Sequence, residues 1–181
     1  MKAFQPEATV LIVPGLRDHV ADHWQTLLAE GLEKVVTVPP LTSDKLSCQA
    51  RVEAITQALA RIQGPVILVA HSAGVLMVVH WAARYQRPIK GALLAAPPDL
   101  NATWPDNYPT PDSLRANAWA PLPSGPLPFP SILAASTDDY LQLFACLLEA
   151  VVSRDLPRIR EVLTAYCQRS CELVLAALAR A

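Results

Sequence analysis

The chain has 181 residues, of which 15 are basic and 16 acidic, so its formal net charge is −1. Because the two signs are interspersed, the sequence offers no basic stripe for phosphates, and a nucleic-acid partner is not expected. The hydrophobic fraction is 52%, yet no run approaches the roughly eighteen apolar residues of a membrane span. The N-terminal stretch lacks the long apolar run of a secretory signal, so we expect a cytoplasmic protein without a membrane segment.

The length fits a single domain over residues 1–181. The four cysteines are scattered, and the one close pair has no second pair or nearby histidine to complete a zinc site. We therefore expect reduced, mostly buried thiols, no metal and no cofactor. The cysteines are Cys48, Cys146, Cys167 and Cys171.

Apolar runs bounded by glycine or proline predict strands that are buried on both faces of a parallel sheet. These runs cover residues 8–15, 34–40, 64–72, 89–98 and 129–137. Amphipathic stretches lie between the first four runs and predict helices at about 21–33, 47–62 and 74–86. Strand and helix alternate, so we predict the α/β class: a three-layer sandwich with a mainly parallel sheet of five or six strands.

Residues 98–130 interrupt this alternation. They hold nine of the chain's 17 prolines, together with Trp104, Tyr108 and Trp119, and show neither strand nor helix periodicity. A long excursion of this kind is typical of a packed functional loop or a surface wrap. After the last predicted strand the pattern is helical, so we predict an all-helical, atypical tail over residues 141–181.

A short polar interruption follows the third apolar run. Residues 70–74 read Ala-His-Ser-Ala-Gly, between a predicted buried strand and a predicted helix. This fits a small-x-nucleophile-x-small pattern, in which a serine on a sharp strand-to-helix turn leaves no room for side chains on its neighbours. Ser72 is therefore the candidate nucleophile, and the helix behind it offers backbone N–H groups to an oxyanion. The alternative is a serine that merely caps a helix.

Two further features lie where a serine hydrolase would need them. The stretch LIVPGLRDHVADHW places a glycine turn after the first strand, where a second oxyanion donor such as the backbone N–H of Leu16 would lie. A later strand ends in Asp138 and Asp139, where the acid of a Ser-His-Asp triad would follow the serine in chain order. Paired aspartates at such a place also occur as a simple turn or helix cap.

The motifs VPGLRDHVADHW, VAHSAG, LLAAPPDL and LPFPSILAASTDD carry a family likeness. Through them, residues 9 to about 140 resemble the small α/β-hydrolases of the retinoblastoma-binding protein nine and YdeN type. The resemblance implies an α/β-hydrolase-like fold that acts on a small ester, thioester or amide. It also implies roles for individual residues: Ser72 as the nucleophile, Leu16 and Ala73 as backbone donors of the oxyanion hole, and Asp139 as the triad acid.

The general base of that family is missing from this sequence. Its members end in a further strand and a Gly-His, whereas the last histidine here is His80, about two helical turns beyond the candidate serine. We expect His80 to be too far from the serine to act as its base and to be packed within its helix. His71 is expected to turn away from the serine hydroxyl. His19 and His23 follow the glycine turn, and His23 is the candidate for a substitute base. The alternative is that His23 fixes this loop beside the neighbouring tryptophan.

A serine without a base is a poor nucleophile, so the sequence predicts a serine hydrolase whose activity is impaired. The loss of the last strand and its histidine fits a replaced terminus or a shifted reading frame, although regular helical periodicity over residues 141–181 argues partly against a shifted frame.

Two other functions compete with this one. A non-catalytic binding module would keep the hydrolase scaffold and use residues 98–130 to contact a protein partner. An exposed apolar tail would also favour a homodimer. A dehalogenase or an epoxide hydrolase on the same scaffold would need an aspartate in place of Ser72, which argues against that chemistry.

Overall fold

The computed structural model describes residues 8–21, 23–100 and 105–134. The chain divides into two compact units, residues 1–133 and residues 134–181. Only the first residue of the second unit is described. The predictions for Asp138, Asp139, the helical tail and the lost last strand therefore lie outside the described residues, and the single domain stays a prediction.

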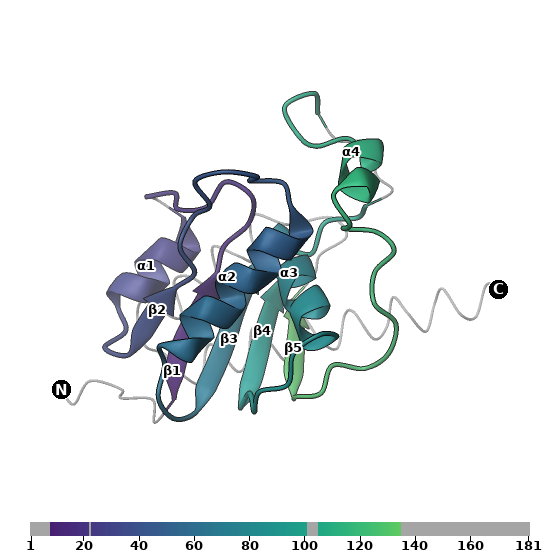
Figure 1. Cartoon of the computed structure of the whole chain (residues 1–181). Coiled ribbons are helices and arrows are strands. Elements are labelled where there is room, and N and C mark those ends of the chain that lie inside the picture. Colours follow the sequence, from purple (N-terminus) through teal and green to yellow (C-terminus); the bar gives the residue numbers. More distant parts are fainter. Residues whose placement is uncertain (1–7, 22, 101–104, 135–181) are drawn as a thin grey trace, which may run out of the picture. The chain divides into compact units, whose positions relative to one another are not determined.

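Five strands form one sheet in the order β2-β1-β3-β4-β5 (Figure 1). The strands are β1 (Thr9–Val13), β2 (Val35–Thr37), β3 (Val66–His71), β4 (Gly91–Ala95) and β5 (Ser131–Ala134). Strand β1 pairs in parallel with β2 and with β3, and β3 pairs in parallel with β4. The predicted α/β class with a mainly parallel sheet is confirmed.

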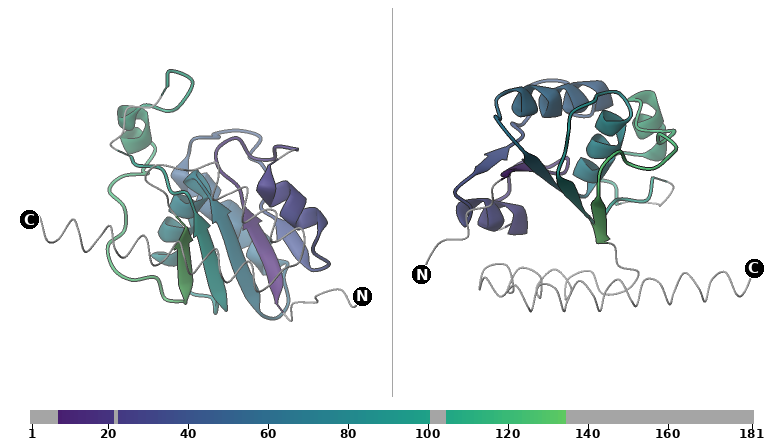
Figure 2. Two further views of the ribbon diagram at one scale, coloured as in Figure 1. Left: turned by 180° about the vertical axis from the view of Figure 1, so that it is seen from behind. Right: turned by 90° about the horizontal axis from the view of Figure 1, so that it is seen from below.

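Three helices connect these strands and cover both faces of the sheet. They are α1 (Trp24–Glu30), α2 (Cys48–Ala60) and α3 (Ala73–Ala82). Helices α2 and α3 lie side by side over one face, and α1 lies on the other, as the end-on view in Figure 2 shows. The three-layer arrangement expected from the alternation of strand and helix is therefore present, with each helix somewhat shorter than its amphipathic stretch.

Side chains alternate along each strand and divide the core between the two faces of the sheet. The larger cluster, between the sheet and the α2–α3 layer, includes Leu11, Leu68, Leu94, Ile55 and Val78. The smaller cluster, beneath α1, comprises Val10, Ile12 and Val69, with Trp24 and Leu28 packed against it. His71 continues the row of Ile67 and Val69 along β3, so alternation places its side chain on the α1 face.

The proline-rich excursion contains one short helix, α4 (Pro111–Ala116). Its six residues are too few to show a helical period, so the sequence did not predict it, although Thr110 caps it and a proline opens it. Trp119 is only 1% exposed, and its indole Nε1 donates to the Leu46 carbonyl oxygen at 2.7 Å. Trp119 is thus packed in the core, and the proposed contact of residues 98–130 with a partner stays a prediction.

The described residues bear on two predictions: buried cysteines and the lack of a membrane-spanning segment. Cys48 is a buried free thiol, and burial raises its pKa. This matches the expectation of reduced, buried cysteines at that position. None of the helices in the described segments has the length and apolar composition needed to cross a bilayer.

Candidate active site

Ser72 lies at the turn between β3 and α3, with φ 55° and ψ −128°. A positive φ is unfavourable for any residue with a Cβ atom, so the surrounding structure must hold this conformation in place. The serine occupies the N-cap position of α3, yet its side chain makes no capping hydrogen bond. The interpretation of Ser72 as an ordinary helix cap is therefore wrong, and its backbone is strained.

Close packing explains the small residues on both sides of this turn. A Cβ atom on Gly74 would lie 2.3 Å from the carbonyl oxygen of Val13 and 2.7 Å from that of Pro14. A Cβ atom on Gly15 would lie 3.2 Å from Cβ of Ser72 and 3.5 Å from its Oγ. The turn after β1 and the turn after β3 therefore pack directly against each other, and only glycine fits at position 74.

The sheet order places this contact where open α/β sheets bind ligands. Val13 pairs with Ala70, and His71 pairs with Ala95, so the loops after β1, β3 and β4 open at the same edge of the sheet. Neighbouring strands β1 and β3 send their connections in opposite directions, toward β2 and β4. Such a switch point leaves a crevice outside the carboxyl ends of the strands.

Ala73 and Leu16, the two predicted oxyanion donors, belong to the two turns that pack against each other at Ser72. Ala73 opens α3, and the N–H groups of a helix's first turn have no carbonyl partner within the helix and carry its positive dipole end. In the turn after β1, the Gly15 carbonyl oxygen accepts from the N–H of Asp18 at 3.0 Å. Because the C=O and N–H of a trans peptide point in opposite directions, the N–H of Leu16 points out of that turn.

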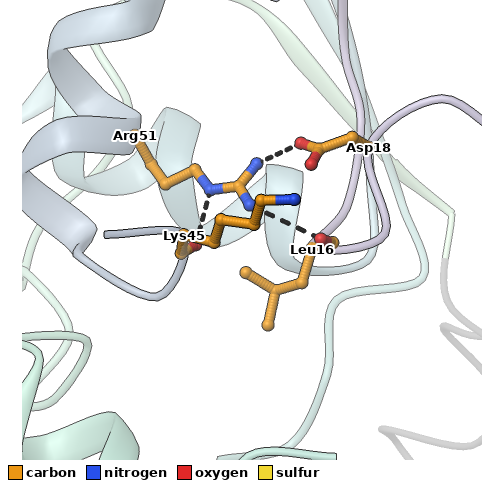
Figure 3. A network of polar contacts seen from close by, with 4 residues as sticks. All are labelled: Leu16, Asp18, Lys45 and Arg51. Atoms are coloured by element: carbon orange, nitrogen blue, oxygen red, sulfur yellow. Dashed lines mark hydrogen bonds and ion pairs between the residues drawn. The ribbon is translucent and has the colours of Figure 1, made fainter. Parts of the chain in front are cut away.

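A buried arginine of α2 contacts the same turn (Figure 3). Arg51 forms an ion pair with the carboxylate of Asp18. It also donates to the carbonyl oxygens of Lys45 at 2.9 Å and Leu16 at 3.4 Å. This network is not predictable from the sequence pattern, because its two charged residues lie 33 positions apart. One signal was present: Arg51 stands four residues before Ile55, on the apolar stripe of its helix.

His23 and His71 form an aromatic cluster with Trp24 on the α1 face of the sheet. The ring centroids of the two histidines are 4.6 Å apart, and the His71 ring lies 5.9 Å from the tryptophan ring in an edge-to-face arrangement. Burial, with smaller contributions from His23 and Arg17, lowers the pKa of His71 to about 4. Burial and Arg17 also lower the pKa of His23. Both rings are therefore neutral at pH 7.

The position of His23 favours a structural role, in which it fixes the loop before α1, over the role of a substitute base. It is the N-cap of α1, and its Nδ1 accepts a hydrogen bond from the N–H of Gln25 at 3.3 Å. A neutral imidazole that accepts at Nδ1 carries its proton on Nε2, so its outward nitrogen is a donor rather than a proton acceptor. His23 thus fixes the start of α1.

Gln25 and His80 are both buried and tied to backbone carbonyl groups. Gln25 donates from its amide nitrogen to Val13 at 3.3 Å and to Val69 at 3.0 Å, which pins α1 to the sheet. No sequence signal pointed to this contact. Nε2 of His80 donates to the Trp119 carbonyl oxygen at 3.1 Å, and burial lowers the pKa of this histidine. His80 is thus the packed helix histidine that the sequence analysis expected.

A cavity of about 320 Å³ lies beside the site on the α1 side, and Ser72 does not line it. Its lining includes Pro14, Asp18, His19, His23, Gln25 and Glu30. Despite these side chains, no group of three His, Cys, Asp or Glu residues within the described segments is arranged to hold a metal ion.

Comparison with known proteins identifies the family. Residues 10–152 match the family Ser_hydrolase, described as serine hydrolase. The chain belongs to this family. The resemblance to small serine hydrolases of the α/β-hydrolase type, predicted from the motifs, is confirmed. No match was found among curated proteins.

Two solved structures are similar to this serine hydrolase family member. One is a YdeN-like hydrolase from Pectobacterium atrosepticum, with 24% identity and a TM-score of 0.56 over 80% of this chain and 72% of that one. This likeness supports the fold. The other is the siderophore hydrolase EstB from Aspergillus fumigatus, with 21% identity and a TM-score of 0.44 over 64% of this chain and 45% of that one.

Proposed function

We propose that this chain hydrolyses a small ester, thioester or amide by nucleophilic attack of Ser72 Oγ on the acyl carbonyl carbon. The observation that carries the proposal is the conformation of Ser72: a strained residue whose hydroxyl does not cap the helix that it precedes. Its contact with the turn at Gly15 and its place at the switch point of the sheet support the same role. Membership of the serine hydrolase family supports it independently.

In the first step, the Ser72 oxygen bonds to the acyl carbon, and the carbonyl oxygen becomes an oxyanion. The N–H groups of Leu16 and Ala73 would donate to that oxyanion, where preorganised donors contribute most to catalysis. The intermediate collapses to an acyl-serine, and the alcohol, thiol or amine leaves with the proton from the serine. Water then attacks the acyl-serine, which releases the acid and restores the hydroxyl. Asp139, from the family resemblance, is the proposed acid of the triad.

We further propose that this activity is impaired in the 181-residue chain. The described residues include all four histidines. His80 donates to a backbone carbonyl group, His23 caps α1, and His71 lies on the α1 face of the sheet. The fourth histidine, His19, is an exposed residue of the loop after β1. Without general-base catalysis a hydrolase loses roughly 10²–10⁴-fold in rate. An intact oxyanion hole with its binding site still retains roughly 10³–10⁴-fold over water.

Hydrolysis of activated aryl esters tests this proposal. The chain should release p-nitrophenol from a short-chain p-nitrophenyl ester slowly but above the buffer rate, and anilides should turn over little, because amides need a protonated leaving group. Ser72→Ala should reduce ester hydrolysis to the buffer rate with the same far-UV circular dichroism spectrum. An ester rate that survives this substitution would remove Ser72 from the reaction.

A further inference from the structure

Arg51 is a buried charged residue, and each of the three nitrogens of its guanidinium group donates to an acceptor. The residue is 3% exposed, and a buried guanidinium is tolerated only where its donors find partners. Its Nε donates to the Lys45 carbonyl oxygen, one terminal nitrogen pairs with the Asp18 carboxylate, and the other donates to the Leu16 carbonyl oxygen (Figure 3). One side chain of α2 therefore ties together its own N-terminal loop and the turn after β1.

The turn that Arg51 holds contains a residue with a left-handed backbone conformation. Asp18 has a φ of 56°, a conformation that residues with a Cβ atom rarely adopt without support. Within the turn, its N–H donates to the Gly15 carbonyl oxygen. Gly15 in turn packs against Ser72. A continuous line of contacts thus runs from Arg51 through this turn to the proposed nucleophile.

The N-terminal end of α2, which carries Arg51, is fixed to the core by hydrogen bonds. Ser47 caps α2 by accepting from the N–H of Ala50 at 3.2 Å. The loop before the helix accepts the indole N–H of Trp119 at the Leu46 carbonyl oxygen, and the N–H of Cys48 donates to the Asn117 carbonyl oxygen at 3.2 Å. The start of α2 is therefore fixed to the core, which fixes the position of the guanidinium.

We infer that Arg51, acting through Asp18, is a positioning residue that holds the turn at residues 15–18 against Ser72 and so places the N–H of Leu16 beside the serine oxygen. The catalytic consequence rests on the proposed function. Because an oxyanion-hole donor acts mainly in the transition state, loss of this support should lower kcat more than it raises KM. Lysine cannot replace the arginine, since a single ammonium group does not reach three acceptors in a fixed fork.

The experiment compares Arg51→Lys with Arg87→Lys. Arg87 is a matched control, because its guanidinium donates to the carbonyl oxygens of Leu59 and Ile62 at the opposite end of α2. Two quantities are measured on the full chain: the second-order rate of Ser72 labelling by a fluorophosphonate, and hydrogen–deuterium exchange of the peptide that covers residues 14–19. Arg51→Lys should slow labelling at least tenfold and speed exchange in that peptide, whereas Arg87→Lys should change labelling less than twofold.

Asp18→Asn serves as the second variant, and it should lower the labelling rate in the same direction as Arg51→Lys. For both variants, kcat on the aryl ester should fall while KM changes less than threefold. Equal labelling of Arg51→Lys and Arg87→Lys would overturn the inference, as would unchanged exchange at residues 14–19. If the unsubstituted chain is not labelled at Ser72, the proposed function fails. The exchange data then decide alone whether Arg51 holds the turn: faster local exchange in Arg51→Lys supports it, and unchanged exchange overturns it.

Discussion

Gly74 packs against the carbonyl oxygen of Val13 so closely that a Cβ atom on the glycine would lie 2.3 Å from that oxygen. The first turn of α3 therefore rests on the backbone at the end of β1. This contact brings Ser72, which directly precedes α3, beside the turn after β1. A glycine is thus required two places after the serine, because the start of α3 and the end of β1 approach each other so closely there.

Gly74→Ala should consequently destabilise the fold. The added methyl group meets backbone atoms that cannot rotate away, so we expect a loss of at least about 2 kcal/mol in the free energy of unfolding, measured by urea denaturation. Gly31→Ala is the control, because a Cβ atom there would lie 3.6 Å from the nearest backbone oxygen, an ordinary contact. Equal stability of the two variants would contradict the close packing described for Gly74.

The histidine cluster predicts a pH dependence of stability. The pKa of His71 is about 4 in the folded chain and 6.5 in the reference state, so between these values the unfolded chain binds more protons. The free energy of unfolding therefore rises with pH through this window and falls as the pH drops from 6.5 toward 4. Since solvent reaches part of the ring, we expect His71 to contribute about 1–2 kcal/mol to this change.

Urea denaturation of His71→Gln at pH 7 and pH 4.5 measures that contribution. The variant should lose less stability than the unsubstituted chain on acidification, and part of the slope should remain because burial also lowers the pKa of His23 and His80. His19→Gln removes an exposed imidazole and serves as the control. A steeper acid loss in His71→Gln than in the unsubstituted chain would show that the sign of the argument is wrong.

His23→Ala tests whether this histidine acts as a substitute base. Because its Nδ1 accepts the N–H of Gln25, we expect the variant to keep its ester hydrolysis within about threefold and to lose about 1 kcal/mol of stability with the helix cap. The two effects are separated by measuring initial rates and urea denaturation on the same preparation. If activity disappears while the fold persists, His23 is the base and the impaired-enzyme proposal must be withdrawn.

Restoring a family-like terminus tests the proposed impairment. Replacement of the residues after Asp139 by a segment that encodes a further strand and a Gly-His should raise the aryl ester rate by roughly 10²–10⁴-fold, the usual contribution of a general base. The same segment with glutamine in place of its histidine is the matched control and should give no such increase. Equal rates for both chimaeras would mean that the missing histidine does not limit this chain.

The sequence predicted most of the elements that place the candidate site. Apolar runs bounded by glycine and proline located β1 to β5, because burial on both faces leaves an unbroken apolar pattern. The small residues around Ser72 predicted its sharp turn, since sterics alone exclude larger ones. Likewise, the place of His80 in an apolar helix predicted that it is packed in the core.

The contacts that support the site escaped prediction for physical reasons. Arg51 and Asp18 meet only after α2 has packed beside the turn that follows β1, and nothing local to either residue encodes that meeting. In the sequence, Gln25 looks like an ordinary polar residue of a helix. Its side-chain amide meets the carbonyl groups of two strands only in the folded chain. The role of His23 depended on which ring nitrogen faces the helix, which is set by three-dimensional geometry and not by spacing.

Site-resolved labelling with a fluorophosphonate tests the central claim most directly, because an oxyanion hole stabilises the charge that develops on the reagent's oxygen as a serine attacks its phosphorus. The full chain is treated at pH 7.5, digested and mapped by mass spectrometry, with Ser72→Ala and the urea-unfolded chain treated in parallel. The account predicts one phosphonylated residue, Ser72, formed slowly in the folded chain and absent from both controls. The account would be contradicted if the folded chain formed no adduct at Ser72, or if the urea-unfolded chain formed the adduct equally well.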